Sequence, residues 1–240
     1  MLYGPRGKRW AMTERGASAL SRADDFISIG PSRLSWERDR LSIRIDEITV
    51  PLPGRLRGRI TLYPSTLGTT SFALDPAGRH RWAPLAPRAR AEVGFDAPSL
   101  RWSGDAYFDT NAGAAPLESD FRHWTWSRRH DAGGTMMLYD VACRDGTAHS
   151  LALRCDANGN IESFAPPSLR PLRPTAWRLA RATRGDAGIR VLRTLEDTPF
   201  YARSVLETGE GLAVHEALSL DRFRAPWVQA MLPFRMPRRG

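Results

Sequence analysis

Lysine is nearly absent from this 240-residue chain: Lys8 is the only one, so the excess of basic charge is an excess of arginine. The 35 basic against 26 acidic residues leave a formal charge of +9. Such a balance is typical of proteins that bind nucleic acid or an anionic membrane. The arginines, however, are spread among acidic residues in runs no longer than two, so no basic stripe that could follow a phosphate backbone is evident. We therefore predict no nucleic-acid partner.

Cysteine is also scarce, since Cys143 and Cys155 are the only two. The Asp-Gly dipeptide at residues 145–146 predicts a two-residue hairpin turn between them. That turn sets Cys143 opposite Ala148 and leaves Cys155 near Met136. In this register the two thiols do not face each other, so we expect no disulfide.

Long hydrophobic runs are missing as well. No unbroken apolar stretch approaches the roughly 18 residues that a membrane-spanning helix needs, and no signal-peptide pattern follows Met1. These features predict a cytoplasmic protein that does not span a membrane. Peripheral contact with a membrane stays open, because an arginine-rich surface is attracted to anionic lipid.

Helical periodicity is hard to find, whereas alternation with a period of two recurs. Leu41, Ile43 and Ile45 alternate with polar residues, as in a half-buried strand. Similar patterns predict strands at residues 56–62, 88–95, 100–108, 121–129, 135–143, 149–155, 176–182, 189–195, 201–208 and 212–220. Twenty Gly and eighteen Pro residues, scattered without a period, supply turns between such short elements.

Roughly a dozen short antiparallel strands predict an all-β fold with at most short helices, either a sandwich or barrels, and two small barrels in tandem suit this length. The small residues and the proline of Thr110–Glu118 mark a boundary between an N-terminal domain, residues 1–115, and a C-terminal domain, residues 116–240. The proline-rich stretch Ala165–Pro174 is interpreted as a loop within the second domain, because too few strands follow it to close a barrel alone.

Several kinds of chemistry find no support in the sequence. The five histidines show no metal-ligand spacing, and the two cysteines are not spaced for zinc. No glycine-rich phosphate loop lies between a strand and a helix, and no serine has the flanking glycines of a nucleophile elbow. We therefore predict no metal, no nucleotide cofactor and no serine-hydrolase chemistry.

Two pairs of residues stand out, His80 with Trp82 and Tyr107 with Asp109. Residues two apart on a strand point to the same face, so each pair can face one cavity. An imidazole, an indole, a phenol and a carboxylate that converge there make an apolar pocket with a few titratable groups, as small-molecule sites do. The alternative is that Trp82 and Tyr107 are core aromatics and that Asp109 caps the turn toward Asn111.

A second candidate group lies on the strand predicted at residues 121–129. Trp124, Trp126 and Arg128 share one face of that strand, either as a packed cation–π ladder or as the wall of a ligand site. Trp102 and Asn111, on either side of the Tyr-x-Asp pair, complete the residues that we expect to bind a substrate.

Longer segments resemble a known family. They are residues 102–118 (WSGDAYFDTNAGAAPLE), 121–128 (FRHWTWSR), 2–16 (LYGPRGKRWAMTERG) and 231–238 (MLPFRMPR). Together they resemble the carotenoid 1,2-hydratases, also called hydroxyneurosporene synthases, over the whole length of the chain. Members of that family normally carry several dozen further residues before the Leu-Tyr-Gly that here follows Met1, so we expect the N-terminal domain to be incomplete at its start.

The resemblance implies two tandem lipocalin-like antiparallel barrels and a hydro-lyase without a cofactor. Such an enzyme adds water to the terminal C1=C2 double bond of an acyclic carotene, neurosporene or lycopene, and yields a 1-hydroxy carotenoid. The family's His-x-Trp and Tyr-x-Asp pairs match His80, Trp82, Tyr107 and Asp109, which implies that these four are catalytic. Because acyclic carotenes are confined to membranes, the resemblance implies a peripheral protein on the cytoplasmic side of the inner membrane. The oligomeric state is not indicated.

Each of the four residues suits a hydration that begins with an acid. Burial in an apolar pocket favours the protonated form of a carboxyl group, which lets Asp109 protonate C2 so that positive charge develops on C1. The faces of Trp82 and Tyr107 stabilise that cation. His80 orients water and accepts its proton, or Asp109 does so itself once it is deprotonated.

Two other functions are compatible with the same fold. A lipocalin-like carrier holds an apolar isoprenoid unchanged and has no use for a buried carboxylate, whose desolvation is unfavourable. A cyclase of this fold leaves the mass of its polyene unchanged, whereas hydration adds one water.

Overall fold

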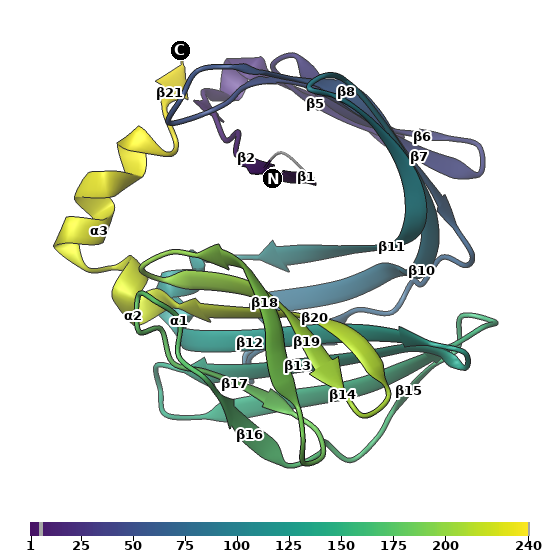
Figure 1. Ribbon diagram of the computed structural model, residues 1–240, viewed down its shortest axis with the longest axis vertical. Helices are drawn as coiled ribbons and strands as arrows, with labels where there is room; N and C mark the ends of the chain where they lie inside the picture. The colour runs from purple at the N-terminus through teal and green to yellow at the C-terminus, as the bar shows by residue number, and fades with distance from the viewer. Residues whose placement is uncertain (5–6, 240) are drawn as a thin grey trace. The chain divides into compact units, whose positions relative to one another are not determined.

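The structure, a computed structural model, describes residues 1–4 and 7–239 and shows an all-β protein (Figure 1). Among these residues the helices are short: α1 (Leu117–Asp120), α2 (Leu220–Phe223), α3 (Pro226–Met231) and 3-10 turns at Ala17–Ala19 and Leu232–Phe234. The predictions of an all-β fold and of at most short helices are confirmed. Within the described part of the chain, no helix has both the length and the apolar character that crossing a membrane requires.

The chain divides into two compact units. The first comprises residues 1–65, 89–107 and 229–240, and the second comprises residues 66–88 and 108–228. The long strands β10 (His80–Ala97) and β11 (Ser99–Gly113) contribute to both units. Domains 1–115 and 116–240, as independently folding parts, remain a prediction.

An eight-stranded sheet contains the long strands of the first unit (Figure 1). Its order is β11, β10, β8, β7, β6, β5 and β4, with β9 paired to β10. The other bounds are β4 (Leu20–Ala23), β5 (Phe26–Ile29), β6 (Ser32–Glu37), β7 (Arg40–Ile48), β8 (Arg55–Pro64) and β9 (Phe72–Ala73). In β7, Leu41 is buried and Arg44 is exposed, because one face of the sheet covers a core and the other meets solvent.

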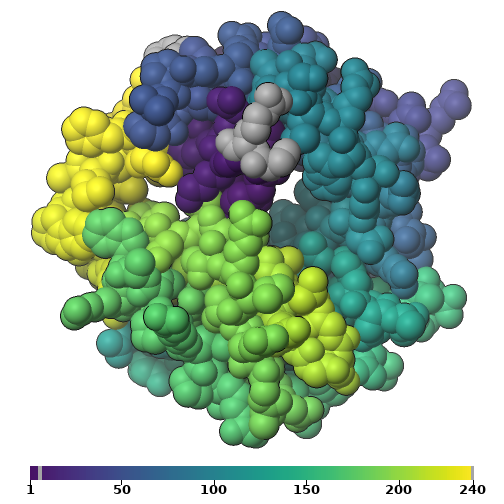
Figure 2. Space-filling model, viewed as in Figure 1, coloured from purple at the N-terminus to yellow at the C-terminus, as the bar shows by residue number. Residues whose placement is uncertain are grey.

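A seven-stranded antiparallel sheet lies in the second unit, whose green residues lie together in the space-filling view (Figure 2). Its order is β15, β14, β13, β12, β20, β19 and β18. The bounds are β12 (Phe121–Asp131), β13 (Gly134–Cys143), β14 (Ala148–Asp156), β15 (Ile161–Ser163), β18 (Arg190–Asp197), β19 (Tyr201–Thr208) and β20 (Gly211–Ser219). Three consecutive residues of β13, Met137, Leu138 and Tyr139, are buried, so this central strand is covered on both faces.

Short pairs of strands accompany the two sheets in the described residues. They are β1 (Leu2–Gly4) with β2 (Gly7–Arg9), β16 (Leu169–Leu172) with β17 (Arg181–Arg184), and the parallel pair β3 (Glu14–Arg15) with β21 (Arg238–Arg239). The strands before residue 40 were not predicted, because each is too short to show a clear alternation.

The strand predicted at residues 176–182 is wrong except at its end, since β17 begins only at Arg181. The Thr175 hydroxyl accepts a hydrogen bond from the backbone N–H of Leu179, and Arg178 adopts a left-handed conformation with φ +56°. Both features form a turn and interrupt a strand. The interpretation of residues 165–174 as a loop is wrong where β16 pairs with β17.

The predicted register between the two cysteines is wrong by one residue. Ala142, not Cys143, lies opposite Ala148, and Cys155 lies opposite Thr135. The turn uses three residues, 144–146, with its glycine at φ +90°, because the Asp-Gly pair occupies the last two positions of a three-residue loop. Both cysteines are buried and free.

Candidate active site

The first two residues of interest lie at the start of β10, in the second unit. His80 is 2% exposed and Trp82 is 1% exposed. Their spacing of two residues places both side chains on one face of the strand. A buried imidazole needs polar partners, so the surroundings of His80 define the polar part of the site.

Trp82 joins the two sequence pairs. Its indole N–H donates a hydrogen bond of 2.7 Å to Oδ2 of Asp109, which is half-buried on β11. Strand β11 continues through Asn111 to Gly113, so there is no turn at Asn111 for Asp109 to cap. The contact fixes the orientation of the carboxyl group against an aromatic side chain.

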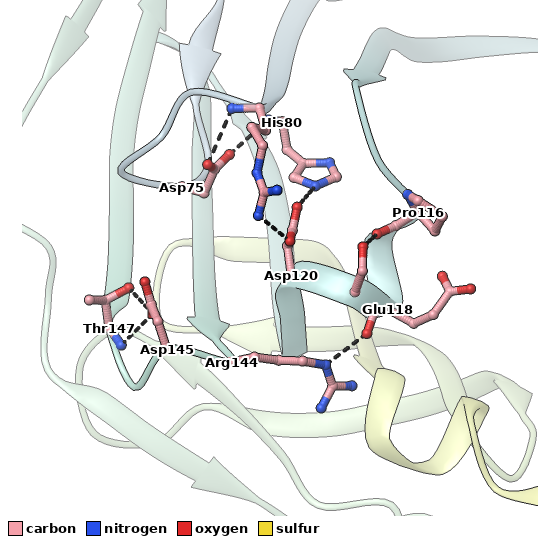
Figure 3. Close-up of polar contacts among 10 residues, drawn as sticks. Asp75, His80, Pro116, Glu118, Asp120, Arg144, Asp145 and Thr147 are labelled. Atoms are coloured by element: carbon pink, nitrogen blue, oxygen red, sulfur yellow. Dashed lines mark hydrogen bonds and ion pairs between the residues drawn. The ribbon is translucent and has the colours of Figure 1, made fainter.

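A second carboxylate holds His80. Nε2 of His80 lies 2.6 Å from Oδ2 of Asp120, and the guanidinium of Arg79 binds the other carboxylate oxygen (Figure 3). Asp120 ends α1, and the next residue, Phe121, packs its ring against the imidazole with a centroid distance of 4.7 Å. Sequence reasoning missed Asp120, because forty residues separate it from His80 and no motif links them.

The backbone at His80 is fixed as well. Asp75 accepts hydrogen bonds from the backbone N–H groups of His80, at 2.7 Å, and Arg79, at 3.2 Å (Figure 3). Burial opposes ionisation of Asp75, but these N–H groups hold the pKa of its carboxyl below the usual value. Backbone and ring of His80 are therefore anchored by two different carboxylates.

The remaining ring nitrogen of His80 lies beside Gly113 at the end of β11. A Cβ atom on Gly113 would lie 2.6 Å from Nδ1 of His80, closer than side-chain carbons approach in proteins. This glycine does not adopt a left-handed conformation, so the reason for it is the close approach of the imidazole to the backbone of β11.

Tyr139 adds an aromatic ring that the sequence analysis missed. Its ring lies edge-on to Trp82, with a centroid distance of 5.4 Å, and 5.7 Å from the ring of Trp124. Burial raises the pKa of the Tyr139 phenol, and the carboxyl groups of Asp109 and Glu216 raise it further when they are ionised. Tyr139 therefore stays a neutral phenol within the aromatic cluster. It was missed because it lies in an apolar run without a polar neighbour two residues away.

The other predicted residues differ in their surroundings. Trp126 is buried on β12, and a guanidinium nitrogen of Arg128 lies 2.6 Å from Nε2 of His130. Asn111 is exposed on β11. Tyr107 and Trp102 belong to the first unit, where Trp102 is 47% exposed. The second unit thus brings together His80, Trp82, Asp109 and Trp124, and the functional roles of all nine predicted residues remain predictions.

No metal-binding cluster is found in the part of the chain that the structure describes: no three or more His, Cys, Asp or Glu side chains are grouped to hold an ion. The grouped side chains are instead three carboxyls, one imidazole, one guanidinium and four aromatic rings. Such a set can donate and accept protons and can stabilise a cation next to aromatic faces.

Comparison with known proteins gives one consistent family. The family model described as carotenoid hydratase CrtC matches residues 1–240. The chain is 54% identical over 246 residues to the acyclic carotenoid 1,2-hydratase of Thiocapsa roseopersicina, covering 100% of this chain and 61% of that protein. It is 40% identical over 244 residues to the acyclic carotenoid 1,2-hydratase of Cereibacter sphaeroides, covering 99% of this chain and 87% of that protein. The chain therefore spans less than two thirds of the Thiocapsa protein.

A solved structure supports the fold. The crystal structure of an AttH-type protein from Nitrosomonas europaea is similar with a TM-score of 0.58 and 17% sequence identity. The similarity covers 85% of this chain and 72% of that one. At this sequence identity the similarity supports the lipocalin-like architecture and gives no information about activity.

Proposed function

The chain belongs to the CrtC family of carotenoid hydratases, and we propose that it is a hydro-lyase that adds water to the terminal C1=C2 bond of an acyclic carotene such as neurosporene or lycopene. The observation that carries this proposal is the hydrogen bond from the Trp82 indole to Asp109, which sets a proton donor against an aromatic surface. The product is the 1-hydroxy carotenoid. The reaction is an addition without a change of oxidation state overall, so it requires no redox cofactor.

Asp109 supplies the first proton. Because Oδ2 accepts the indole N–H, the transferable proton of the carboxyl group is carried on Oδ1. Transfer to C2 forms the new C–H bond and leaves the positive charge on C1, the more substituted carbon. The Trp82 contact keeps the carboxyl group in one orientation, which lowers the entropic cost of reaching the geometry for proton transfer.

The cation that forms needs electron-rich surfaces that do not react with it. We assign this role to the rings of Trp82 and Tyr139, which are buried and pack edge-on in the second unit, each contributing roughly 0.5–2 kcal/mol to stabilising a cation. Trp124 extends this cluster through its contact with Tyr139. The catalytic role predicted for Tyr107, which belongs to the first unit, stays a prediction.

His80 accepts the second proton. Its Nε2–H donates to the Asp120 carboxylate, so the lone pair of the neutral imidazole is on Nδ1. Nδ1 lies close to the backbone of Gly113 at the end of β11. The water that attacks C1 forms the C–O bond and transfers a proton to Nδ1. The imidazolium then releases this proton to solvent, and solvent returns one proton to Asp109, so the sum is alkene plus water giving alcohol.

The apolar character of the substrate bears on where in the cell the protein acts. Acyclic carotenes are hydrocarbons that dissolve in bilayers, so we propose a peripheral protein on the cytoplasmic face of the inner membrane. The formal charge of +9 supports this proposal, because anionic lipid attracts basic surfaces.

The test is product analysis in a strain that makes neurosporene or lycopene. Asp109→Asn keeps the hydrogen-bond acceptor but lacks the transferable proton, so 1-hydroxy carotenoid should fall by at least about 100-fold. Asp105→Asn, which changes an exposed carboxylate on the same strand, should leave the yield unchanged. Equal yields from the Asp109 variant and the parent would exclude Asp109 as the acid.

The same assay distinguishes a hydratase from a cyclase and from a carrier. An isomer of unchanged mass would identify a cyclase, because hydration adds the mass of one water. Carotene that co-purifies with the parent chain, without any product, would identify a carrier.

A further inference from the structure

A row of arginines crosses the solvent face of the eight-stranded sheet, and the proposed reaction does not use it. The strand register sets Arg33 of β6 opposite Arg44 of β7, and Arg44 opposite Arg59 of β8. Arg59 in turn lies opposite Gly94 of β10, which has no side chain. All three side chains are exposed and lie in the first unit. We call Arg33, Arg44 and Arg59 the arginine row.

The arginine row borders a groove in the first unit. The groove has a volume of about 860 Å³. Its charged lining residues are Arg44, Arg57, Arg59 and Arg101, with Glu92 and Asp96. Gly94 lies in the same lining, and a Cβ atom there would contact nothing within 4 Å, so the groove is open at this point. Four guanidinium groups against two carboxylates leave the groove positive.

The positive charge of the arginine row is not neutralised within the protein. Among the described residues, no carboxylate forms an ion pair with Arg33, Arg44 or Arg59. The nearby Asp46 is already bound by Arg55, with an Nε to Oδ1 distance of 2.6 Å. Like charges directly opposite each other on neighbouring strands are destabilising, so an anion that binds between them relieves repulsion.

We propose that the arginine row and its groove are the surface that docks on an anionic lipid bilayer. Guanidinium groups bind phosphate through paired N–H donors, and the row presents three of them in a line. Trp102, 47% exposed, lines the same groove, and an indole next to basic residues is typical of the interface between headgroups and hydrocarbon. This inference rests on the proposed function, because a carotene substrate is supplied from a bilayer.

The test is co-sedimentation of the full chain with vesicles, which needs no turnover. The vesicles are either phosphatidylcholine alone or an equimolar mixture with phosphatidylglycerol. Arg44→Gln/Arg59→Gln should weaken binding to the mixed vesicles by about 30-fold, the effect of two arginines at an anionic surface. The matched control, Arg170→Gln/Arg193→Gln, removes two exposed arginines of the second unit and lowers the formal charge by the same two units. It should bind like the parent.

Trp102 has an equally matched control. Trp102→Ala should weaken binding to the mixed vesicles by a few-fold, whereas Trp177→Ala, which removes an indole that is also 47% exposed, should not. Thermal unfolding of each variant shows whether it is folded. Because neutralising the row relieves repulsion, the double variant should be at least as stable as the parent, so lost binding cannot come from unfolding.

Three results would overturn the proposal. Equal losses in the two double arginine variants would show that net charge, and not this face, governs binding. Unchanged vesicle binding in the row variant would show that another surface docks. Lost binding to duplex DNA with unchanged vesicle binding would assign the groove to nucleic acid. Hydration of detergent-dispersed carotene reports separately on the proposed function, and the row variant should retain it.

Discussion

Arginine has different surroundings in the second unit's ion pairs and in the arginine row of the first unit. In the second unit Arg184 binds Asp140, with an Nε to Oδ1 distance of 2.7 Å, and Arg203 binds Glu216, with an Nε to Oε1 distance of 2.8 Å. Arg79 is likewise bound to Asp120. In the arginine row the strand register sets three arginines on neighbouring strands, and no carboxylate in the described part of the chain forms an ion pair with them. One residue type therefore fixes side chains in ion pairs at some positions and leaves its charge unpaired in the row. The following changes test that contrast.

The largest effect is expected from Asp120→Asn, which removes the paired charge beside His80. An asparagine amide that donates to Nε2 moves the imidazole proton to Nδ1, where a lone pair is needed to accept the proton of water. Product formation should fall by about 10³-fold, as when an orienting carboxylate of a catalytic histidine is replaced.

Two measurements separate this positioning role from simple destabilisation. The ¹⁵N NMR shifts of the His80 ring should show the proton on Nε2 in the parent and on Nδ1 in the variant. Asp145→Asn, in an exposed turn of the same unit, should change neither the shifts nor the yield. An unchanged tautomer with lost activity would contradict the assigned role.

The next effect concerns His215, which is 1% exposed in the second unit. Burial, partly opposed by a hydrogen bond to the Ala182 carbonyl, lowers the pKa of His215 from 6.5 to about 4. The unfolded chain therefore binds this proton at a higher pH than the folded chain. The free energy of unfolding should fall as the pH drops from 6.5 through 4, by about 3 kcal/mol in all.

Urea unfolding across this pH range isolates the contribution of His215. His215→Gln removes the titrating group and keeps a donor for the Ala182 carbonyl, so its free energy of unfolding should depend less on pH than that of the parent. Parallel pH curves for the two proteins would show that His215 does not titrate differently on unfolding.

A smaller effect is expected from Gly113→Ala, which places a methyl group 2.6 Å from Nδ1 of His80. The imidazole has to move away from the methyl group, so the rate of product formation should fall by about 10-fold. Gly209→Ala adds a methyl group where nothing lies within 4 Å and should have no effect. A fully active Gly113 variant would show that the reaction does not depend on this position of the imidazole.

The smallest effect is expected in the first unit. Arg44→Gln removes the central charge of the arginine row and should raise the free energy of unfolding by about 0.5 kcal/mol, because like charges on facing strands repel. Arg170→Gln, outside the row, should change it by less. Thermal unfolding at low ionic strength measures both. A destabilised Arg44 variant would mean that the row makes favourable contacts within the fold.

The sequence predicted contacts between near neighbours and missed contacts between distant ones. The alternation around Leu41 and the spacing of His80 and Trp82 follow from the geometry of a single strand, so both could be inferred. The contact of His80 with Asp120 joins residues forty apart, and no local pattern encodes it. The prediction of a strand at residues 176–182 was wrong because Arg178 forms a turn with φ +56°. Arginine rarely adopts this conformation, so the sequence did not indicate the turn.

The arginine row is another arrangement of distant residues that the sequence did not predict. Its members lie eleven and fifteen residues apart, among acidic residues, and the sequence alone shows no basic stripe. Only the pairing of three strands aligns them. The absence of a stripe was therefore a wrong inference about the surface, whereas the absence of a nucleic-acid partner remains a prediction.

The use of arginine in this row also determines which signals can control it. A guanidinium group stays protonated throughout the physiological pH range, and lysine acetylation cannot neutralise it. Neither a change of pH within that range nor an acetyltransferase can therefore release the surface from an anionic partner. Ionic strength can, because salt screens exposed charges over about 8 Å under physiological conditions. Under the proposed docking, the row is a constitutive contact whose strength is set by salt and by the fraction of anionic lipid.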